Sequence, residues 1–188
     1  MKSIITILLG LFICLPVAGA DKEKPLPKDL KSLKVLAEKG DAQAQSALGA
    51  VYAVGQGVKQ DSKEAVKWFR KAAEQRCAKA QYNLGVIYRD SEGVLKDFKE
   101  AVKWFRKAAE QGYDNAQVNL GAMYANGNGV PQDNLTAYAW WNIAHTNGQA
   151  LAKKYKDIIA KLMTPDQITK AEALSKEMIK KNPKLLKK

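Results

Sequence analysis

The sequence is poor in the residues from which most enzyme sites are built. Its 188 residues include one histidine and two cysteines, and the usual motifs of zinc hydrolases, serine hydrolases, nucleotide-binding and penicillin-recognising proteins are absent. The one histidine, His145, lies near the end of an expected helix, where a protonated imidazole is stabilised by the negative pole. Catalysis needs a nucleophile, an acid–base pair or a metal site. We therefore predict a protein that is not an enzyme and that holds no metal or cofactor.

The longest apolar run, residues 4–17, is too short to span a membrane, which takes about 20 apolar residues. It follows Lys2 and precedes Ala-Gly-Ala at 18–20, the small-residue pattern cut by signal peptidase, and a charged segment begins at Asp21. These features favour a cleaved signal peptide at 1–20 over a retained membrane anchor. They predict an exported protein, either periplasmic or secreted.

Cysteine is too scarce for a disulfide framework. Cys14 lies in the expected signal peptide, where lipid attachment would give a lipoprotein, an alternative weakened by the bulky Ile13 before it. Removal of residues 1–20 leaves Cys77 as the one cysteine, so we predict no intramolecular disulfide. Its place between two expected helices indicates a buried, inert side chain rather than a thiol that pairs between molecules.

Acidic residues are a minority, with 19 Asp and Glu against 31 Lys and Arg and a net charge of +12. Such a charge can indicate nucleic-acid binding, but an exported protein meets anionic lipids, wall polymers and acidic proteins first. The lysines are also spread over nearly every expected helix. We therefore interpret them as a solvated surface and predict no nucleic-acid partner.

An internal repeat of 36 residues is the main feature of the chain. The segment from Lys63 to Gln75 recurs unchanged from Lys99 to Gln111. A third, more divergent copy follows at the same spacing, which assigns repeats to 41–76, 77–112 and 113–148. Identical residues recur in all three copies at Leu48, Leu84 and Leu120; Gly49, Gly85 and Gly121; Tyr52, Tyr88 and Tyr124; Ala65, Ala101 and Ala137; and Trp68, Trp104 and Trp140.

Each repeat contains two amphipathic helices. Apolar residues of the first helix recur at i, i+4, i+7 and i+8, and those of the second at i, i+3, i+4 and i+7, both typical of one helical face. Asp61 and Asp97 are expected to cap the second helix of their repeats. The mid-helix glycines at 49, 85 and 121 indicate close approach of the partner helix.

The segments before and after the repeats predict caps for the two ends. We assign a linker to 21–29, a half-repeat helix to 30–40, a capping helix pair to 149–182 and a lysine-rich tail to 183–188. Terminal caps are required because one helix pair cannot bury its apolar face alone.

The copies share a spacing of Ala, Gln, Leu, Gly, Tyr, Gly-x-Gly-Val, Asp, Ala, Trp and Ala, with Ser91 in place of the first turn glycine in repeat two. This spacing resembles the Sel-1-like repeat, a relative of the tetratricopeptide repeat. The resemblance covers roughly residues 30–182 and implies an all-α fold, a right-handed α-solenoid of antiparallel helix pairs. It implies an adaptor that binds other proteins, with no particular ligand. Some exported members carry paired cysteines and are linked with β-lactam binding or hydrolysis. That remote alternative is not favoured here because the cysteine pairs are missing.

A helical wheel places polar residues on one side of the first helix in repeats two and three, away from the core stripe. Asparagine amides both donate and accept hydrogen bonds, so this side could bind the backbone of an extended peptide in a concave groove. The alternative is an ordinary polar surface. The candidate binding residues are Lys79, Asn83, Asp90, Asn115, Asn119 and Asn126. We expect a protein or peptide partner and a monomeric chain.

The C-terminal tail offers a second kind of function. Five lysines among the last nine residues, together with Leu185 and Leu186, could bind anionic lipid or a wall polymer. A frayed, solvated tail is the interpretation we favour. The aromatic pair Trp140 and Trp141 could suggest sugar stacking, but Trp140 has the register of the core positions Trp68 and Trp104, so we assign the pair to the core.

Overall fold

The computed structural model describes residues 26–27, 29–90 and 95–187, and within these ranges all of the regular secondary structure is helical. The segments expected to be the signal peptide and most of the linker lie outside the described residues. The helices are α1 (Leu30–Glu38), α2 (Ala42–Val54), α3 (Ser62–Glu74), α4 (Ala78–Asp90), α5 (Phe98–Ala109), α6 (Asp114–Asn126), α7 (Asn134–Thr146), α8 (Ala150–Ala160), α9 (Pro165–Lys181) and the 3₁₀ turn η1 (Pro183–Leu185).

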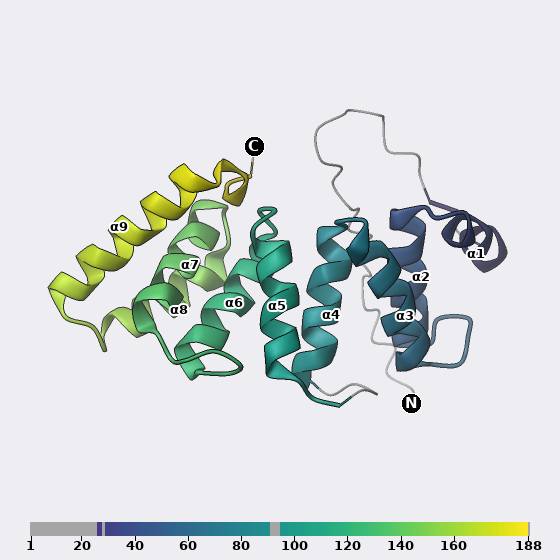
Figure 1. Cartoon of the computed structure of the whole chain (residues 1–188), viewed down its shortest axis with the longest axis horizontal. Helices are drawn as coiled ribbons and strands as arrows, with labels where there is room; N and C mark the ends of the chain where they lie inside the picture. Colours follow the sequence, from purple (N-terminus) through teal and green to yellow (C-terminus); the bar gives the residue numbers. More distant parts are fainter. Residues whose placement is uncertain (1–25, 28, 91–94, 188) are drawn as a thin grey trace, which may run out of the picture.

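The helices stack in chain order into an elongated body, with α1 at one end and α9 at the other (Figure 1). Each helix from α1 to α7 packs on the next, while α8 and α9 both pack on α7. Contacts are therefore mostly between neighbours, which is the arrangement of a solenoid. The prediction of an all-α solenoid built from helix pairs is confirmed. No helix in the described ranges is long and apolar enough to cross a membrane.

The buried core residues recur at the same positions of each sequence repeat. Equivalent leucines, alanines and aromatic residues are buried in each unit, including Phe69, Phe105 and the tryptophans at 140 and 141. The mid-helix glycines lie directly against this aromatic layer. A Cβ atom added at Gly85 would lie 2.5 Å from the Phe105 ring, and one at Gly121 would lie 2.6 Å from the indole nitrogen of Trp141. These positions therefore require glycine because the partner helix is too close for any side chain.

Each second helix begins at the same type of cap. Asp61, Asp97 and Asp133 each accept hydrogen bonds from two backbone N–H groups of the first turn. Their own backbone N–H groups donate to the carbonyls of Tyr52, Tyr88 and Tyr124, each at 2.9 Å. The cap thus also closes the loop between the two helices of a unit. Arg76 holds the left-handed conformation, with φ 66°, at the position where other units have glycine.

The cysteine between α3 and α4 is buried, as expected. Cys77 has 4% of its surface exposed and packs in the core cluster of repeats one and two. The absence of an intramolecular disulfide from a chain without residues 1–20 stays a prediction.

The C-terminal tail is not frayed, contrary to the interpretation we favoured. Residues 183–185 form η1, and Leu185 is 2% exposed in the same core cluster as Phe105, Ile143 and Leu120. Burial of one leucine side chain contributes about 1.5–3 kcal/mol, which is enough to hold a short segment against the body. The tail is therefore part of the fold.

Candidate functional site

The six predicted binding residues all lie on the first helices of repeats two and three. Lys79, Asn83 and Asp90 belong to α4, and the three asparagines at 115, 119 and 126 belong to α6. Asp90 and Asn126 are exposed and the other four are half-buried. All six are thus reachable from solvent. We call the surface that they form the amide face.

Hydrogen bonds join several of these residues. Arg89 forms a two-bonded ion pair with Asp90, at 2.6 and 2.7 Å, and its guanidinium also donates to the side-chain oxygen of Asn119. The amide of Asn119 donates to the backbone carbonyl of Asn115, one turn earlier, at 2.8 Å. Arg89 therefore links α4 to α6 across the amide face.

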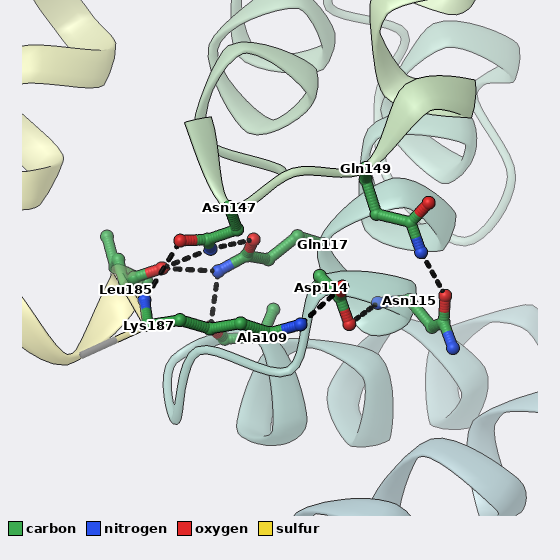
Figure 2. Close-up of polar contacts among 8 residues, drawn as sticks. All are labelled: Ala109, Asp114, Asn115, Gln117, Asn147, Gln149, Leu185 and Lys187. Atoms are coloured by element: carbon green, nitrogen blue, oxygen red, sulfur yellow. Dashed lines mark hydrogen bonds and ion pairs between the residues drawn. The ribbon is translucent and has the colours of Figure 1, made fainter. Parts of the chain in front are cut away.

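The other asparagine side chains of this face differ in whether they have a hydrogen-bond partner among the described residues. Gln149, just before α8, donates to the side-chain oxygen of Asn115 at 2.6 Å (Figure 2). Asn83 and Asn126 make no side-chain hydrogen bond with any other described residue. Asn83, half-buried and with its amide unused, is thus the member of the set best placed to bind a ligand's backbone.

Two tyrosines that the sequence analysis missed belong to the same region. The rings of Tyr82 and Tyr113 lie 5.2 Å apart, and Tyr82 also lies 5.9 Å from Phe105. Burial is the main reason that the pKa of each phenol is raised. Neither tyrosine recurs at the equivalent repeat positions, where Ser46 and Val118 correspond to Tyr82. That departure from the repeat is the signal that could have found them.

Two charged residues of the amide face have pKa values that their surroundings shift. Hydrogen bonding to Arg89 lowers the pKa of Asp90, which therefore stays ionised. Burial lowers the pKa of Lys79. Within the ranges that the structure describes, no group of three or more His, Cys, Asp or Glu residues could hold a metal ion. The arrangement is suited to hydrogen bonding and charge recognition.

A second arrangement, not predicted, lies where α5 meets α6 and holds the C-terminal tail (Figure 2). The backbone carbonyl of Leu185 accepts hydrogen bonds from the side-chain amides of Gln117, at 2.8 Å, and Asn147, at 2.7 Å. The oxygen of Asn147 accepts from the backbone N–H of Lys187 at 2.9 Å. The two amides thus bind the tail through its backbone, as a peptide ligand would be bound.

Charge and close packing complete this binding. The ammonium of Lys187 lies 2.6 Å from the carboxylate of Asp114, and the Asn182 amide donates to the carbonyl of Glu110 at 2.8 Å. A Cβ atom at Gly112 would lie 2.4 Å from the carbonyl oxygen of Lys184, so the tail also requires glycine there. We call the surface formed by Gly112, Asp114, Gln117 and Asn147 the tail cleft.

Departures from the repeat mark the tail cleft in the sequence. Ile143 stands where the other copies have Lys71 and Lys107, and Asn147 stands where they have glutamine. Asp114 replaces an alanine in the same way. An apolar residue, a shorter amide and a carboxylate thus appear together in the copy that holds a leucine- and lysine-containing tail. Reading the third copy as merely divergent missed this pattern.

Comparisons with known proteins agree with the repeat architecture. The family model described as Sel1 repeat matches residues 42–77, 78–113 and 114–148. A search of curated proteins finds no match. The crystal structure of a protective antigen of uropathogenic Escherichia coli strains, displaying an SLR fold, is 43% identical, with a TM-score of 0.76 over 82% of this chain and 33% of that chain. The present chain thus spans about a third of that antigen's length.

A second solved structure is matched over nearly its whole length. The Sel1 repeat protein from Oxalobacter formigenes is 38% identical, with a TM-score of 0.63 over 70% of this chain and 98% of that chain. The three family matches together cover more than half of the sequence, and each matched range contains one of the helix pairs described above. The chain belongs to the Sel1 repeat family, whose members are generally non-catalytic scaffolds for protein–protein interaction.

Proposed function

We propose that this protein is a non-catalytic adaptor that binds an extended segment of a partner protein along the amide face. The observation that carries the proposal is the half-buried, unused amide of Asn83, which lies on the same helix as the fixed ion pair of Arg89 and Asp90. A backbone amide group offers one donor and one acceptor, which an asparagine side chain can match. The aromatic rings of Tyr82 and Tyr113 add apolar contact area nearby.

Asn83→Ala combined with Asn126→Ala is expected to reduce capture of the partner from an envelope extract at least about fivefold, because two hydrogen bonds of about 1 kcal/mol each would be lost. Capture is measured by quantitative mass spectrometry on immobilised protein. Neither side chain has a hydrogen bond with another residue that the structure describes, so the melting temperature is expected to change little.

The matched control is Lys67→Ala combined with Lys103→Ala. Both lysines are exposed on the second helices of their repeats, so this double substitution tests surface changes away from the amide face. The proposal requires that the control retain capture. If the asparagine variant captures the same proteins in the same amounts as the parent, the amide face is not the binding site.

We also propose that the adaptor acts after export, in the envelope or outside the cell. The support is the sequence pattern of residues 1–20, which lie outside the described residues. In the native organism, the intact mass of the purified protein is expected to correspond to a chain beginning at Asp21. A chain that retains residues 1–20, or that carries a lipid, would contradict the proposal.

Binding of the tail to an anionic surface is less well supported. Leu185 is buried in the core and Lys187 is paired with Asp114, so neither projects from the body as a free membrane anchor would. Lys180, Lys181 and Lys184 remain exposed. In the part of the tail that the structure describes, what remains is a basic surface, because Leu185 and Leu186 both pack on the core.

A further inference from the structure

The amide pair that holds the tail has a counterpart one repeat earlier. Gln81 and Gln111 lie 36 residues before Gln117 and Asn147. Gln81 donates to the carbonyl of Ala73 at 3.0 Å, as Gln117 donates to the carbonyl of Ala109 at 3.3 Å. Gln111 donates to the side-chain oxygen of Gln81 at 2.7 Å, as Asn147 donates to Gln117 at 2.9 Å. The two junctions therefore present the same amide groups in the same arrangement.

The two junctions differ in how many acceptors the glutamine side-chain nitrogen has. In the tail cleft, the Gln117 nitrogen makes a second hydrogen bond, to the carbonyl of Leu185. Gln81 is 3% exposed, and its nitrogen has one acceptor among the described residues. At the first junction Gln45, the equivalent of Gln81, likewise donates to one described carbonyl, that of Ala37 at 3.0 Å. At the second junction Gln111 donates to Gln81 and also, at 3.4 Å, to the carbonyl of Lys107. The Gln81 nitrogen can therefore donate to one further acceptor, the role that Leu185 fills for Gln117.

A cleft of 590 Å³ opens beside this pair. Its size falls in the range of sites that hold small ligands or a few residues of peptide. We call it the second-repeat cleft, and it is lined by Ala73, Glu74, Arg76, Gln81, Lys107, Glu110, Gln111, Asn182 and Lys184. Lys184 belongs to the docked tail and Asn182 directly precedes it, so the second-repeat cleft and the tail cleft adjoin.

We propose that the second-repeat cleft binds an extended, acidic peptide segment of a partner protein. The tail shows that this type of amide pair binds a peptide backbone carbonyl, and the equivalent pair at Gln81 and Gln111 supplies the same donors. This site lies at the junction of α3, α4 and α5, and its lining residues do not include any of the six residues of the amide face.

The acidic character follows from the residues that differ between the two clefts. Lys107 stands where the tail cleft has Ile143, the residue that shares a core cluster with Leu185. A ligand side chain at that place therefore meets an ammonium group instead of an apolar surface. Arg76 and Lys184 add two further cations, against the carboxylates of Glu74 and Glu110. The lining thus carries three positive and two negative charges, which favours an acidic ligand.

The chain's own basic tail sequence is a poor match for this cleft. Ala78 replaces Asp114, so at that position no carboxylate pairs with a lysine equivalent to Lys187. Docking of a second copy's tail is therefore disfavoured on electrostatic grounds.

A fluorescent hexapeptide tests the proposal on the full chain. The probe is the sequence of residues 182–187 with glutamate in place of Lys184, Leu185 and Lys187, and the reference is the unaltered sequence. Fluorescence anisotropy at low ionic strength is expected to show saturable binding of the acidic probe and at least about fivefold weaker binding of the reference. Lys107→Glu is expected to weaken binding of the acidic probe at least about fivefold through like-charge repulsion.

Lys103→Glu is the matched control, since Lys103 is exposed on the same helix but does not line the cleft. It is expected to change the affinity less than about twofold. Absence of saturable binding, or equal loss from the two lysine variants, overturns the proposal. So does loss caused by Asn83→Ala but not by Lys107→Glu, an outcome that would place the peptide on the amide face.

Discussion

Replacing Phe105 with alanine is expected to lower the free energy of unfolding by about 3–5 kcal/mol. Phe105 is fully buried, and it lies in the cluster that joins repeats two and three. Loss of its ring removes apolar burial from both neighbours at once and leaves a cavity. Urea unfolding followed by circular dichroism measures the change. Leu95→Ala is the control, because Leu95 is 91% exposed and its loss is expected to change stability by less than about 0.5 kcal/mol.

The contact between Gly85 and Phe105 gives this prediction a second test. Gly85→Ala alone is expected to cost about 1–3 kcal/mol, since the new methyl group would lie 2.5 Å from the ring. In the Phe105→Ala background the ring is gone, so the same methyl group fits the cavity. The two changes are expected to be non-additive, with the double variant at least about 1 kcal/mol more stable than the sum of the single effects. Additive effects would show that the glycine is not required by the ring.

Gly112→Ala is expected to cost about 3–5 kcal/mol, of which about 1–2 kcal/mol is the strain of alanine in the left-handed conformation. The remainder comes from the tail. The new Cβ atom would lie 2.4 Å from the Lys184 carbonyl, so the tail must leave the cleft, and the burial of Leu185 is lost. Urea unfolding of the full chain measures the total.

Gly40→Ala is the matched control for this change. Gly40 has φ 96° against 83° at Gly112, but no atom lies within 4 Å of its added Cβ, so the control reports backbone strain alone. In a chain truncated after Lys181, the two alanine substitutions are expected to cost about the same. If Gly112→Ala is no more destabilising than Gly40→Ala in the full chain, the tail does not depend on the close contact at Gly112.

The repeat period was sufficient to predict most of the fold. Three copies of the same apolar pattern place Leu84, Phe105 and their equivalents in the core, and the caps at Asp61 and Asp97 follow from local chemistry alone. These features are local or recur at a fixed spacing, so a single sequence contains the information. The contact of glycine with an aromatic ring is repeated in the same way and could be inferred from the mid-helix position.

The tail cleft could not be predicted by the same reasoning. The carbonyl of Leu185 meets Gln117 across 68 positions of sequence, and Asn182 meets Glu110 across 72. The first separation is not a multiple of the 36-residue repeat. The second is, but both contacts use backbone carbonyls that any residue supplies, so the sequence carries no signal for them. Lysines in the tail suggested solvation, whereas the pairing of Lys187 with Asp114 depends on how α9 returns along α7.

The amide face could be predicted from the sequence only in part. A helical wheel correctly placed the six polar residues on the exposed or half-buried side of α4 and α6. It could not show that Arg89 donates a hydrogen bond to Asn119 or that Gln149 donates one to Asn115. Side-chain partners from a neighbouring helix depend on rotamers and packing, which periodicity does not contain.

Attachment of the tail to the α5–α6 junction changes how the molecule can come apart. A linear stack held by contacts between neighbours can fray from either end, one helix at a time. The hydrogen bond from Gln117 to Leu185 attaches the tail to α6, which precedes α7, and the bond from Asn147 attaches it to the end of α7. These hydrogen bonds close the segment from α6 to η1 into a non-covalent loop. Helix α9 therefore cannot separate from α7 until they break. Slow amide exchange is therefore expected to extend through the C-terminal third as one cooperative block, with opening confined to the α1 end.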